Sequence, residues 1–393
     1  MANIEALFER YVHTVIPSKE EAVRRIASSR EPLTVYLGID PTGPDIHLGH
    51  STNLLWLREW IAAGQKAVLL IGDFTAQIGD PTGKDAARAS LTRAQVEENM
   101  ASYLDQVHKI LAPGSFQIAY NSDWLGPMTF TDVVKLASHI TVQQMIVRDM
   151  FQRRLEAGNP IHLHEFFYPL MQGYDSVALN IDAEVGGNDQ FFNMMMGREL
   201  LQSLKHKDKL VITTKLLEDP TTGKKIMNKS EGRYVSLRDS AEEMFGKIMA
   251  MPDSAIIPLL TYATTVPLAR VTDAERRLIS ENPKNIKQEV AREIVTLYHG
   301  DVAARDAQDS FEKIFTRGEL PESIQEVSSV SGNSWPESLV AWELAESKAA
   351  AKRLIEQGAV RLNGEKVTDW ATGPNLKSGD VIQVGSREFR KVK

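Results

Sequence analysis

Cysteine is absent from the 393-residue sequence, which excludes disulfides, thiolate catalysis and cysteine-ligated zinc. A metal site would have to use carboxylates and the nine histidines, and the imidazoles of the trio His162, His164 and Glu165 would diverge on a helix. No apolar run approaches the ~18 residues of a membrane helix, and Glu5 and Glu9 stand where a signal peptide would be basic and then apolar. We therefore expect a cytoplasmic chain with no membrane partner and no protein-bound metal.

Size and charge suggest several units with different tasks. The length exceeds the ~250 to 300 residues at which one hydrophobic core stops growing, so we expect two or three units. Hydrophobic residues make up 42% and charged residues 25%, as in an ordinary globular chain. Residues 348–393 hold ten Lys or Arg against five Asp or Glu, a net of +5, which leaves -12 on the rest of a chain whose total is -7. A basic end on an acidic body predicts a polyanionic partner at that end.

Short β-branched runs alternate with longer helical patterns over the first half of the chain, as they do in parallel α/β units. Residues 33–39 and 66–71 are predicted buried strands, and residues 48–63 between them follow a 3.6-residue period. The alternation predicts an α/β fold with a Rossmann-like parallel sheet. The expected organisation is a Rossmann-like domain at 1–215, a loop region at 216–236, a helical domain at 237–316, a linker at 317–335 and a small α+β module at 336–393.

A junction between a predicted strand and a predicted helix carries the first polar constellation, YLGIDPTGPDIHLGH at residues 36–50. A helix N-terminus offers unpaired N–H donors and partial positive charge, so phosphates bind there readily. His47 and His50 would add donors on the first turn, and Gly49 would let a flat adenine ring approach the backbone. On these residues alone, a capped and partly exposed first turn stays open as the alternative.

A second segment, IGDPTGK at residues 78–84, is followed by Arg88. It is not a Walker loop, because its glycines are too closely spaced and Asp85 replaces the Ser or Thr that would hold magnesium. Its place after the second predicted strand puts it at the carboxyl edge, where open α/β sheets bind ligands.

Two more segments are polar in a way that suggests a pocket. Tyr168, Gln172 and Asp175 recur at i, i+4 and i+7 and share one helix face, which makes a poor core stripe and a plausible pocket wall. Residues 224–232 (KKIMNKSEG) form a basic loop after the sheet region, for which a merely solvated loop is the alternative.

Taken together and in order, these segments resemble the class I aminoacyl-tRNA synthetases, and within them the bacterial-type tyrosyl-tRNA synthetase family. The resemblance covers nearly the whole chain. The matching segments are residues 36–50 for HIGH, 78–84 for IGDP(S/T)GK, 168–175 (YPLMQGYD) for the tyrosine-pocket helix, 186–190 (GGNDQ) for the GG(S/N)DQ loop, 226–230 (IMNKS) for KMSKS, and 347–367 for a small RNA-binding module first described in a ribosomal protein.

The resemblance implies a role for each matching residue. At the ammonium group of tyrosine it places Asp80, Tyr168 and Gln172, with Asp40 and Gln190 nearby, and at the phenolic hydroxyl Tyr36 and Asp175. For ATP it places Thr42, His47 and His50 at the phosphates, Gly49 at the adenine, Asp189 at the ribose, and Gly38, Gly187 and Ser230 beside them. The implied catalytic set is His47, His50, Lys84, Arg88 and Lys229, the last three stabilising the departing pyrophosphate.

The implied reaction has two steps. The tyrosine carboxylate attacks the α-phosphorus of ATP, and a ribose hydroxyl at the 3′ end of tRNA(Tyr) then takes the tyrosyl group. A carboxylate is already nucleophilic, so positioning and charge stabilisation carry the work. Mg²⁺ would be held mainly by ATP, and no tightly bound cofactor is expected.

The KMSKS-like loop, residues 226–230, departs from the family pattern. Its first lysine is replaced by Ile226 and its central serine by Asn228, while Lys229 keeps the second lysine. Lys225, one place earlier, would have to reach the same phosphates. The altered loop leaves open a synthetase-like RNA-binding protein without ligase activity, and a tryptophan-specific relative is disfavoured by Tyr36 and Asp175.

The resemblance also implies partners. The helical domain would recognise the anticodon, and the basic module would grip tRNA phosphates. Residues 133–167 would form the interface of a homodimer. The expected tRNA contacts are Lys348, Lys352, Arg353 and Arg361.

Overall fold

The computed structural model describes residues 4–82, 91–228, 232, 234–315, 324–328, 334–385 and 388–393. Contacts divide the chain into two compact units, unit 1 (Met1–Arg305) and unit 2 (Asp306–Lys393). None of the helices in the described ranges is both long and apolar enough to cross a membrane.

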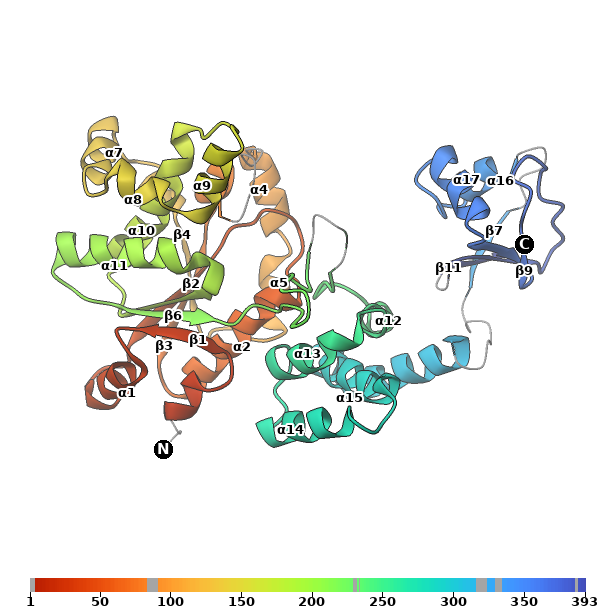
Figure 1. Cartoon of the computed structure of the whole chain (residues 1–393), viewed down its shortest axis with the longest axis horizontal. Helices are drawn as coiled ribbons and strands as arrows, with labels where there is room; N and C mark the ends of the chain where they lie inside the picture. The colour runs from red at the N-terminus through yellow and green to blue at the C-terminus, as the bar shows by residue number, and fades with distance from the viewer. Residues whose placement is uncertain are drawn as a thin grey trace. The chain divides into compact units, whose positions relative to one another are not determined.

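Unit 1 is built on a six-stranded sheet with the order β1-β6-β5-β2-β3-β4 (Figure 1). All neighbouring strands are parallel except β1, which pairs antiparallel with β6 at one edge. The strands are β1 (Val12–Ile16), β2 (Thr34–Ile39), β3 (Lys66–Ile71), β4 (Gln117–Tyr120), β5 (Ala183–Gly187) and β6 (Leu210–Thr214). The predicted Rossmann-like parallel sheet is confirmed, and β1 adds an edge strand that the sequence did not predict.

Helices cover both faces of this sheet. In Figure 1, α10 and α11 lie on one side of the sheet and α1 and α2 on the other. The helices up to β6 are α1 (Lys19–Ser28), α2 (Leu48–Ala62), α3 (Thr75–Ile78), α4 (Arg93–Met100), α5 (Tyr103–His108), α6 (Ser122–Leu125), α7 (Phe130–Ala137), α8 (Val142–Ile146), α9 (Asp149–Glu156), α10 (Phe167–Leu179) and α11 (Phe191–Lys205), with short 3-10 turns η1 (Ile4–Phe8), η2 (Leu163–Phe166) and η3 (Asn188–Gln190).

The helical elements described after the sheet of unit 1 are α12 (Ala241–Met249), η5 (Asp253–Ala255), α13 (Ile256–Tyr262), α14 (Leu268–Arg277) and α15 (Pro283–Phe315). Gly300 interrupts α15 with a φ of 85°, a left-handed value that favours glycine. The buried Arg10 ties this region to the N-terminus of the chain by donating to the main-chain oxygens of residues 260, 261 and 266.

The described residues of unit 2 form a five-stranded sheet with the order β7-β11-β10-β8-β9, the helices α16 and α17, and the last residues of α15. Its elements are β7 (Gln325–Val327), α16 (Trp335–Ala341), α17 (Lys348–Glu356), β8 (Val360–Leu362), β9 (Glu365–Lys366), β10 (Val381–Val384) and β11 (Glu388–Val392). Trp335, Leu339 and Ile382 are buried in a core of its own. The range expected as a linker contains β7, because its three residues pair in parallel with β11, a partner more than sixty positions away that local sequence does not reveal.

Candidate active site

The predicted substrate residues gather where the strand order reverses. The chain runs from β2 to β3 and β4 on one side and returns through β5 and β6 on the other, so the switch lies between β2 and β5. These two strands are in register, with Tyr36 beside Glu184. In open α/β sheets ligands bind outside the carboxyl ends of strands at such a point. Residues 40–50 and 187–190 leave the sheet here.

His47 and His50 form a reciprocal cap at the start of α2. The Gly49 N–H donates to His47 Nδ1 at 3.1 Å, and the His47 N–H donates to His50 Nδ1 at 3.3 Å. Because each Nδ1 accepts, the neutral rings carry their protons on Nε2 and offer these as donors. A Cβ at position 49 would lie 2.9 Å from His47 Cε1, so glycine lets the ring close over the helix end. Both predicted roles, helix cap and phosphate donor, are compatible with this geometry.

The segment that follows the KMSKS-like loop pairs with the start of α2 through an isolated β-bridge between His47 and Ser236. The Leu48 N–H donates to the Val235 oxygen at 3.1 Å, and the Leu237 N–H donates to the Ile46 oxygen at 2.8 Å. Met227 is buried, and its Sδ accepts from the Val235 N–H at 3.5 Å. Two segments almost two hundred residues apart are thus brought together, as the resemblance requires.

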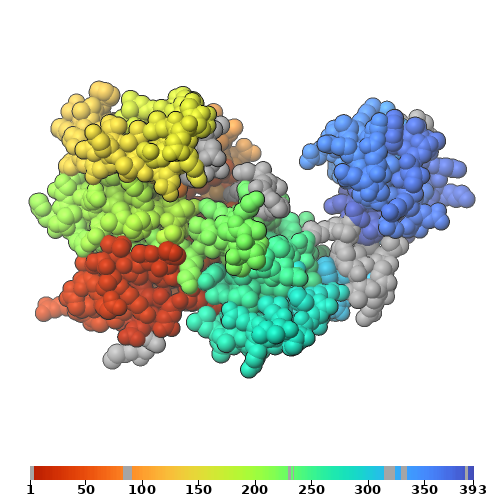
Figure 2. All heavy atoms as spheres, viewed as in Figure 1, coloured from red at the N-terminus to blue at the C-terminus, as the bar shows by residue number. Residues whose placement is uncertain are grey.

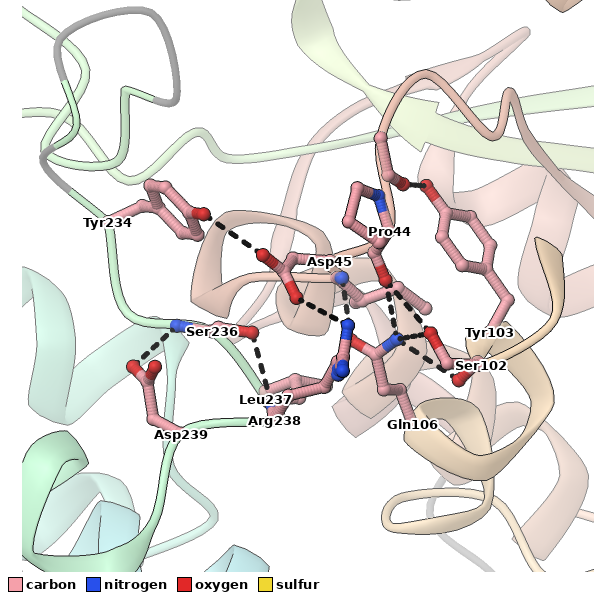
Figure 3. Close-up of polar contacts among 12 residues, drawn as sticks. Pro44, Asp45, Ser102, Tyr103, Gln106, Tyr234, Ser236, Leu237, Arg238 and Asp239 are labelled. Atoms are coloured by element: carbon pink, nitrogen blue, oxygen red, sulfur yellow. Dashed lines mark hydrogen bonds and ion pairs between the residues drawn. The ribbon is translucent and has the colours of Figure 1, made fainter. Parts of the chain in front are cut away.

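Side chains reinforce this pairing from both sides (Figure 3). The Tyr234 hydroxyl donates to Asp45 Oδ2 at 2.9 Å. Gln106, from α5, accepts the Ile46 N–H at 2.7 Å and donates to the Pro44 oxygen at 2.9 Å. The loop between β2 and α2 is therefore fixed to the segment after the KMSKS-like loop and to α5.

Carboxylates and a phenol form the end of the site that is predicted to hold an ammonium group. The Tyr168 hydroxyl donates to Asp40 Oδ2 at 2.8 Å, and the Thr75 hydroxyl donates to Asp40 Oδ1 at 2.7 Å. Gln190 Nε2 donates to Asp80 Oδ2 at 2.8 Å. These oxygens are acceptors of the kind that a buried cation needs.

Gln172, on α10, belongs to the same network of hydrogen-bonded side chains. Its Oε1 accepts from Asn193 Nδ2 at 3.0 Å, and Asn193 Nδ2 also donates to Gln190 Oε1 at 3.0 Å. The amide of Gln172 is thereby oriented with its oxygen toward the Gln190 side of the pocket.

The other end of the predicted pocket is formed by Tyr36 and Asp175, which are 1% and 2% exposed. Trp124 Nε1 donates to Asp175 Oδ1 at 2.8 Å, and Asn121 Nδ2 donates to Oδ2 at 3.4 Å. The Tyr36 hydroxyl lies 3.3 Å from Ser176 Oγ. A hydroxyl and a carboxylate at the end of a buried pocket can recognise a polar group on a planar ring.

Burial changes the acidity of these groups. It raises the pKa of Tyr36 and of Tyr168 well above the ordinary value, and the nearby carboxylates of Glu184 and Asp40 add to the effect. Both phenols therefore keep their protons at neutral pH and act as donors. Burial also raises the pKa of Asp175, against which the donors on Trp124 and Asn121 favour the carboxylate.

Arg148 supports the Asp80 side from the segment before α9. Its Nη2 donates to the Thr82 hydroxyl at 2.9 Å, and Thr82 donates to Asp80 Oδ1 at 2.6 Å. Burial lowers the pKa of Arg148 to about 10, so it stays charged at neutral pH. Its guanidinium also lies 4.4 Å from the Phe192 ring centroid.

Sequence reasoning missed Thr75, Asn121, Trp124 and Arg148. Asn121 and Trp124 follow the carboxyl end of β4, so the rule that located the other segments could have found them. No local sequence pattern indicates that Thr75 or Arg148 belongs to the site, because their roles depend on contacts with residues of other elements.

Four of the predicted residues, Lys84, Arg88, Lys229 and Ser230, lie outside the described residues. Residues 226–228 of the KMSKS-like loop are described, and so is Lys225 directly before it, whose Nζ forms an ion pair with Asp189 Oδ2 at 2.7 Å. Lys225 therefore stands beside the predicted ribose residue, with 52% of its side chain exposed.

Replacing Lys225 with alanine tests whether it takes over from the missing first lysine. When the ribose hydroxyls of ATP bind Asp189, they would replace Lys225 as its partner, and Lys225 could then turn toward the phosphates. We therefore expect Lys225→Ala to slow adenylate formation about 10-fold, which corresponds to a loss of ~1.4 kcal/mol of transition-state stabilisation. Tyrosine binding should barely change. Pre-steady-state adenylate formation measures this, with Lys224→Ala as the matched control. Equal rates in wild type and Lys225→Ala would show that the loop works with one lysine.

Glu165 has a structural partner that accounts for its burial. It forms an ion pair with Arg154 at 2.6 Å and accepts the His162 N–H at 2.8 Å, so it caps the start of η2. Across the described residues, no three His, Asp or Glu side chains are grouped as metal ligands.

The predicted tRNA residues of unit 2 lie on α17 and β8. Lys348 pairs with Glu337 at 2.8 Å, and Lys352 Nζ lies 3.7 Å from the Trp370 ring centroid. Arg361 donates to the Gly364 oxygen at 3.0 Å, and Arg353 is exposed.

Comparison with known proteins gives independent evidence about the family of this chain. Residues 28–316 match the family model described as tRNA synthetases class I (W and Y), and residues 338–382 match the S4 domain.

Individual relatives agree with the family model. The chain is 40% identical over 391 residues to a tyrosine–tRNA ligase of Moorella thermoacetica, covering 98% of this chain and 94% of that protein. It is 42% identical over 399 residues to a tyrosine–tRNA ligase of Carboxydothermus hydrogenoformans, with 98% and 96% covered. Its fold is similar to that of a C-terminally truncated mitochondrial tyrosyl-tRNA synthetase of Aspergillus nidulans, with a TM-score of 0.64, 23% identity, and 80% and 95% covered.

Proposed function

The chain belongs to the tRNA synthetases class I (W and Y), and we propose that within this family it is a tyrosine–tRNA ligase. It activates L-tyrosine with ATP to tyrosyl-adenylate and pyrophosphate, and then transfers tyrosine to the 3′ end of tRNA(Tyr).

The observation that carries this proposal is the pair of polar groups at the buried end of the pocket. Asp175 is held by Trp124 and Asn121, and Tyr36, likewise buried, lies against Ser176, the residue that follows Asp175. The hydroxyl of tyrosine would satisfy both groups, whereas phenylalanine would leave them unpaired and buried. Leaving a buried polar group without a partner costs about 1 to 3 kcal/mol.

The acidic end of the pocket orients the amino acid for attack on ATP. Asp40 and Asp80, with Tyr168, Gln172 and Gln190, accept hydrogen bonds from the ammonium group. The carboxylate then points toward the start of α2, where His47 and His50 present Nε2–H donors to the ATP phosphates. Positioning and charge stabilisation are sufficient, because the attacking carboxylate needs no base.

The nucleotide would sit between the first turn of α2 and the loop after β5. Thr42 and the two histidines would contact phosphates, Gly38 and Gly49 would lie at the adenine side, and Gly187 and Asp189 at the ribose. Mg²⁺ would arrive with ATP, since this ion keeps most of its waters and takes few protein ligands. Lys84, Arg88, Lys229 and Ser230 complete the proposed set.

Charging of tRNA tests the proposal as a whole. Tyrosine should be incorporated into tRNA only with ATP present, and tyrosine-dependent pyrophosphate exchange should proceed without tRNA. A chain that binds tRNA but shows no exchange would instead be the synthetase-like RNA-binding protein.

We propose in addition that the chain is a homodimer through one end of unit 1. Apolar side chains on α7, α8 and the turns near them are exposed, with Phe130 83%, Val142 61%, Val147 65% and Leu163 71% accessible. These elements form one end of unit 1, drawn in yellow in Figures 1 and 2. Water-exposed apolar side chains gathered on one face mark interaction surfaces, and this face includes the range 133–167 implied by the resemblance.

A charge on this face should separate the subunits. We expect Phe130→Glu to weaken dimerisation at least ~100-fold, because a carboxylate would be buried in an apolar interface. Sedimentation velocity over a concentration series measures the change. Ile279→Glu, at a side chain 86% exposed on a different part of unit 1, is the matched control and should leave the dimer intact. A monomeric wild type, or a Phe130→Glu variant that stays dimeric, would contradict the assignment.

A further inference from the structure

A buried ion pair lies behind the pocket and has no role among the residues assigned to tyrosine or ATP. Lys209, directly before β6, is 0% exposed, and Glu184 on β5 is 2% exposed; their side chains form an ion pair. Burying two charges costs several kcal/mol each and is offset only where other hydrogen bonds satisfy them. Stability alone therefore does not explain why this ion pair is buried behind the pocket.

Its hydrogen bonds lead to Tyr36. Lys209 Nζ donates to Ser176 Oγ at 2.6 Å, and Ser176 Oγ lies 3.3 Å from the Tyr36 hydroxyl. Ser176 itself is completely buried on α10, next to Asp175. The second oxygen of Glu184 accepts from Gln172 Nε2 at 3.2 Å. One ion pair is thus connected to residues at both ends of the amino-acid pocket.

The chemistry of these groups sets the direction of the hydrogen bonds. Ser176 Oγ accepts from the Lys209 ammonium, which can only donate, and its own hydrogen can go to the Tyr36 oxygen at 3.3 Å, which is nearer than the Glu184 oxygen at 3.4 Å. The Tyr36 oxygen then accepts from Ser176, and the Tyr36 hydrogen is left for the substrate. The single hydrogen of the substrate hydroxyl goes to the Asp175 carboxylate, which can only accept.

Gly197 leaves the space that the contact between Lys209 and Ser176 requires. A Cβ on Gly197 of α11 would lie 2.6 Å from Lys209 Nζ and 2.7 Å from Ser176 Oγ. Any side chain at position 197 would displace the ammonium or the hydroxyl. Burial lowers the pKa of Lys209, and the Glu184 carboxylate opposes that shift.

We propose that Glu184 and Lys209 are specificity-determining positioning residues, which hold Ser176 so that the Tyr36 hydroxyl donates a hydrogen bond to the phenol oxygen of the substrate. The inference rests on the proposed function and names what selects tyrosine over phenylalanine at that site. Neither residue touches the substrate, and both act through Ser176.

A double-mutant cycle in pyrophosphate exchange tests the proposal. Lys209→Met should lower the ratio of kcat/KM for tyrosine to that for phenylalanine about 10-fold, while KM for ATP stays the same. In a Tyr36→Phe background the same substitution should lower the ratio no further, because the group it positions is gone. Equal losses with both amino acids, or a full second loss in the Tyr36→Phe background, would overturn the proposal.

A second variant covers the case in which Lys209→Met folds poorly. Glu184→Leu combined with Lys209→Met removes both charges, an exchange that is often neutral or stabilising for buried pairs. We expect a thermal midpoint near that of wild type with discrimination still lost. Retained discrimination in this stable variant would refute the proposal.

Lys207→Met is the matched control. It removes a surface pair, Lys207 with Asp182 at 2.8 Å, two residues from Lys209, and should leave the ratio unchanged. A wild type that gives no exchange with tyrosine would count against the proposed function. A wild type that prefers tyrosine, with the preference intact in Lys209→Met, would count against this inference alone.

Discussion

Asp175→Ala should lower kcat/KM for tyrosine in pyrophosphate exchange about 1000-fold. A hydrogen bond to a charged group contributes ~1.5 to 3 kcal/mol, and the substitution also leaves the hydroxyl of the bound tyrosine buried without its acceptor, at a cost of ~1 to 3 kcal/mol. Together these losses are on the order of 4 kcal/mol, or three decades in rate. The ATP parameters should stay near wild type, because the residue lies at the end of the pocket away from α2.

Tyr36→Phe is the comparison for Asp175→Ala. It removes one neutral hydrogen bond, worth ~0.5 to 1.5 kcal/mol, so its effect on tyrosine should be about 10-fold or less. Steady-state exchange with tyrosine and phenylalanine measures both variants. If Asp175→Ala keeps wild-type tyrosine kinetics, the buried end of the pocket has been assigned to the wrong substrate group.

Deleting residues 324–393 should leave tyrosine-dependent exchange nearly intact and reduce tRNA charging at least ~100-fold. All residues proposed to contact tyrosine and ATP belong to unit 1, whereas residues 348–393 carry a net charge of +5. Phosphate contacts by Lys and Arg supply much of the affinity for nucleic acids, so losing them lowers binding steeply. The deletion begins before β7, because that strand pairs with β11 and belongs to the sheet of unit 2.

A variant that removes charges but keeps unit 2 distinguishes the loss of tRNA contacts from the loss of the folded unit. Replacing Lys348, Lys352, Arg353 and Arg361 with glutamine keeps the core of unit 2 and should also weaken charging, with a smaller dependence on salt. Normal charging by the deletion would mean that unit 2 is dispensable. Equal loss of exchange and charging would mean that it stabilises unit 1.

Local sequence was sufficient for the parts of the site that lie within one element. The i, i+4, i+7 spacing correctly put Tyr168, Gln172 and Asp175 on one helix, and α10 extends through all three. The alternation of strands and helices predicted the parallel sheet, and the sheet brings His47 and His50 to its carboxyl edge. These features depend on periodicity, which a short stretch of sequence carries completely.

Features that depend on distant partners could not be predicted. Lys209 directly precedes β6, and no local sequence pattern indicates that its charge is fully buried against Glu184. Whether Lys225 reaches the phosphates was left open by the sequence, and its pairing with Asp189 follows from the path of a loop. β7 is three residues long and is a strand only because β11 lies beside it. In each case a tertiary contact decides what local propensity leaves open.

The most direct test of the central claim is steady-state pyrophosphate exchange by the wild-type protein with tyrosine, tryptophan and phenylalanine compared. A pocket closed by Asp175 and Tyr36 predicts a kcat/KM for tyrosine at least ~1000-fold above that for phenylalanine, since both buried groups would otherwise lack a partner. Tryptophan should be no better than phenylalanine. Exchange that is fastest with tryptophan, or absent with tyrosine, would contradict the account.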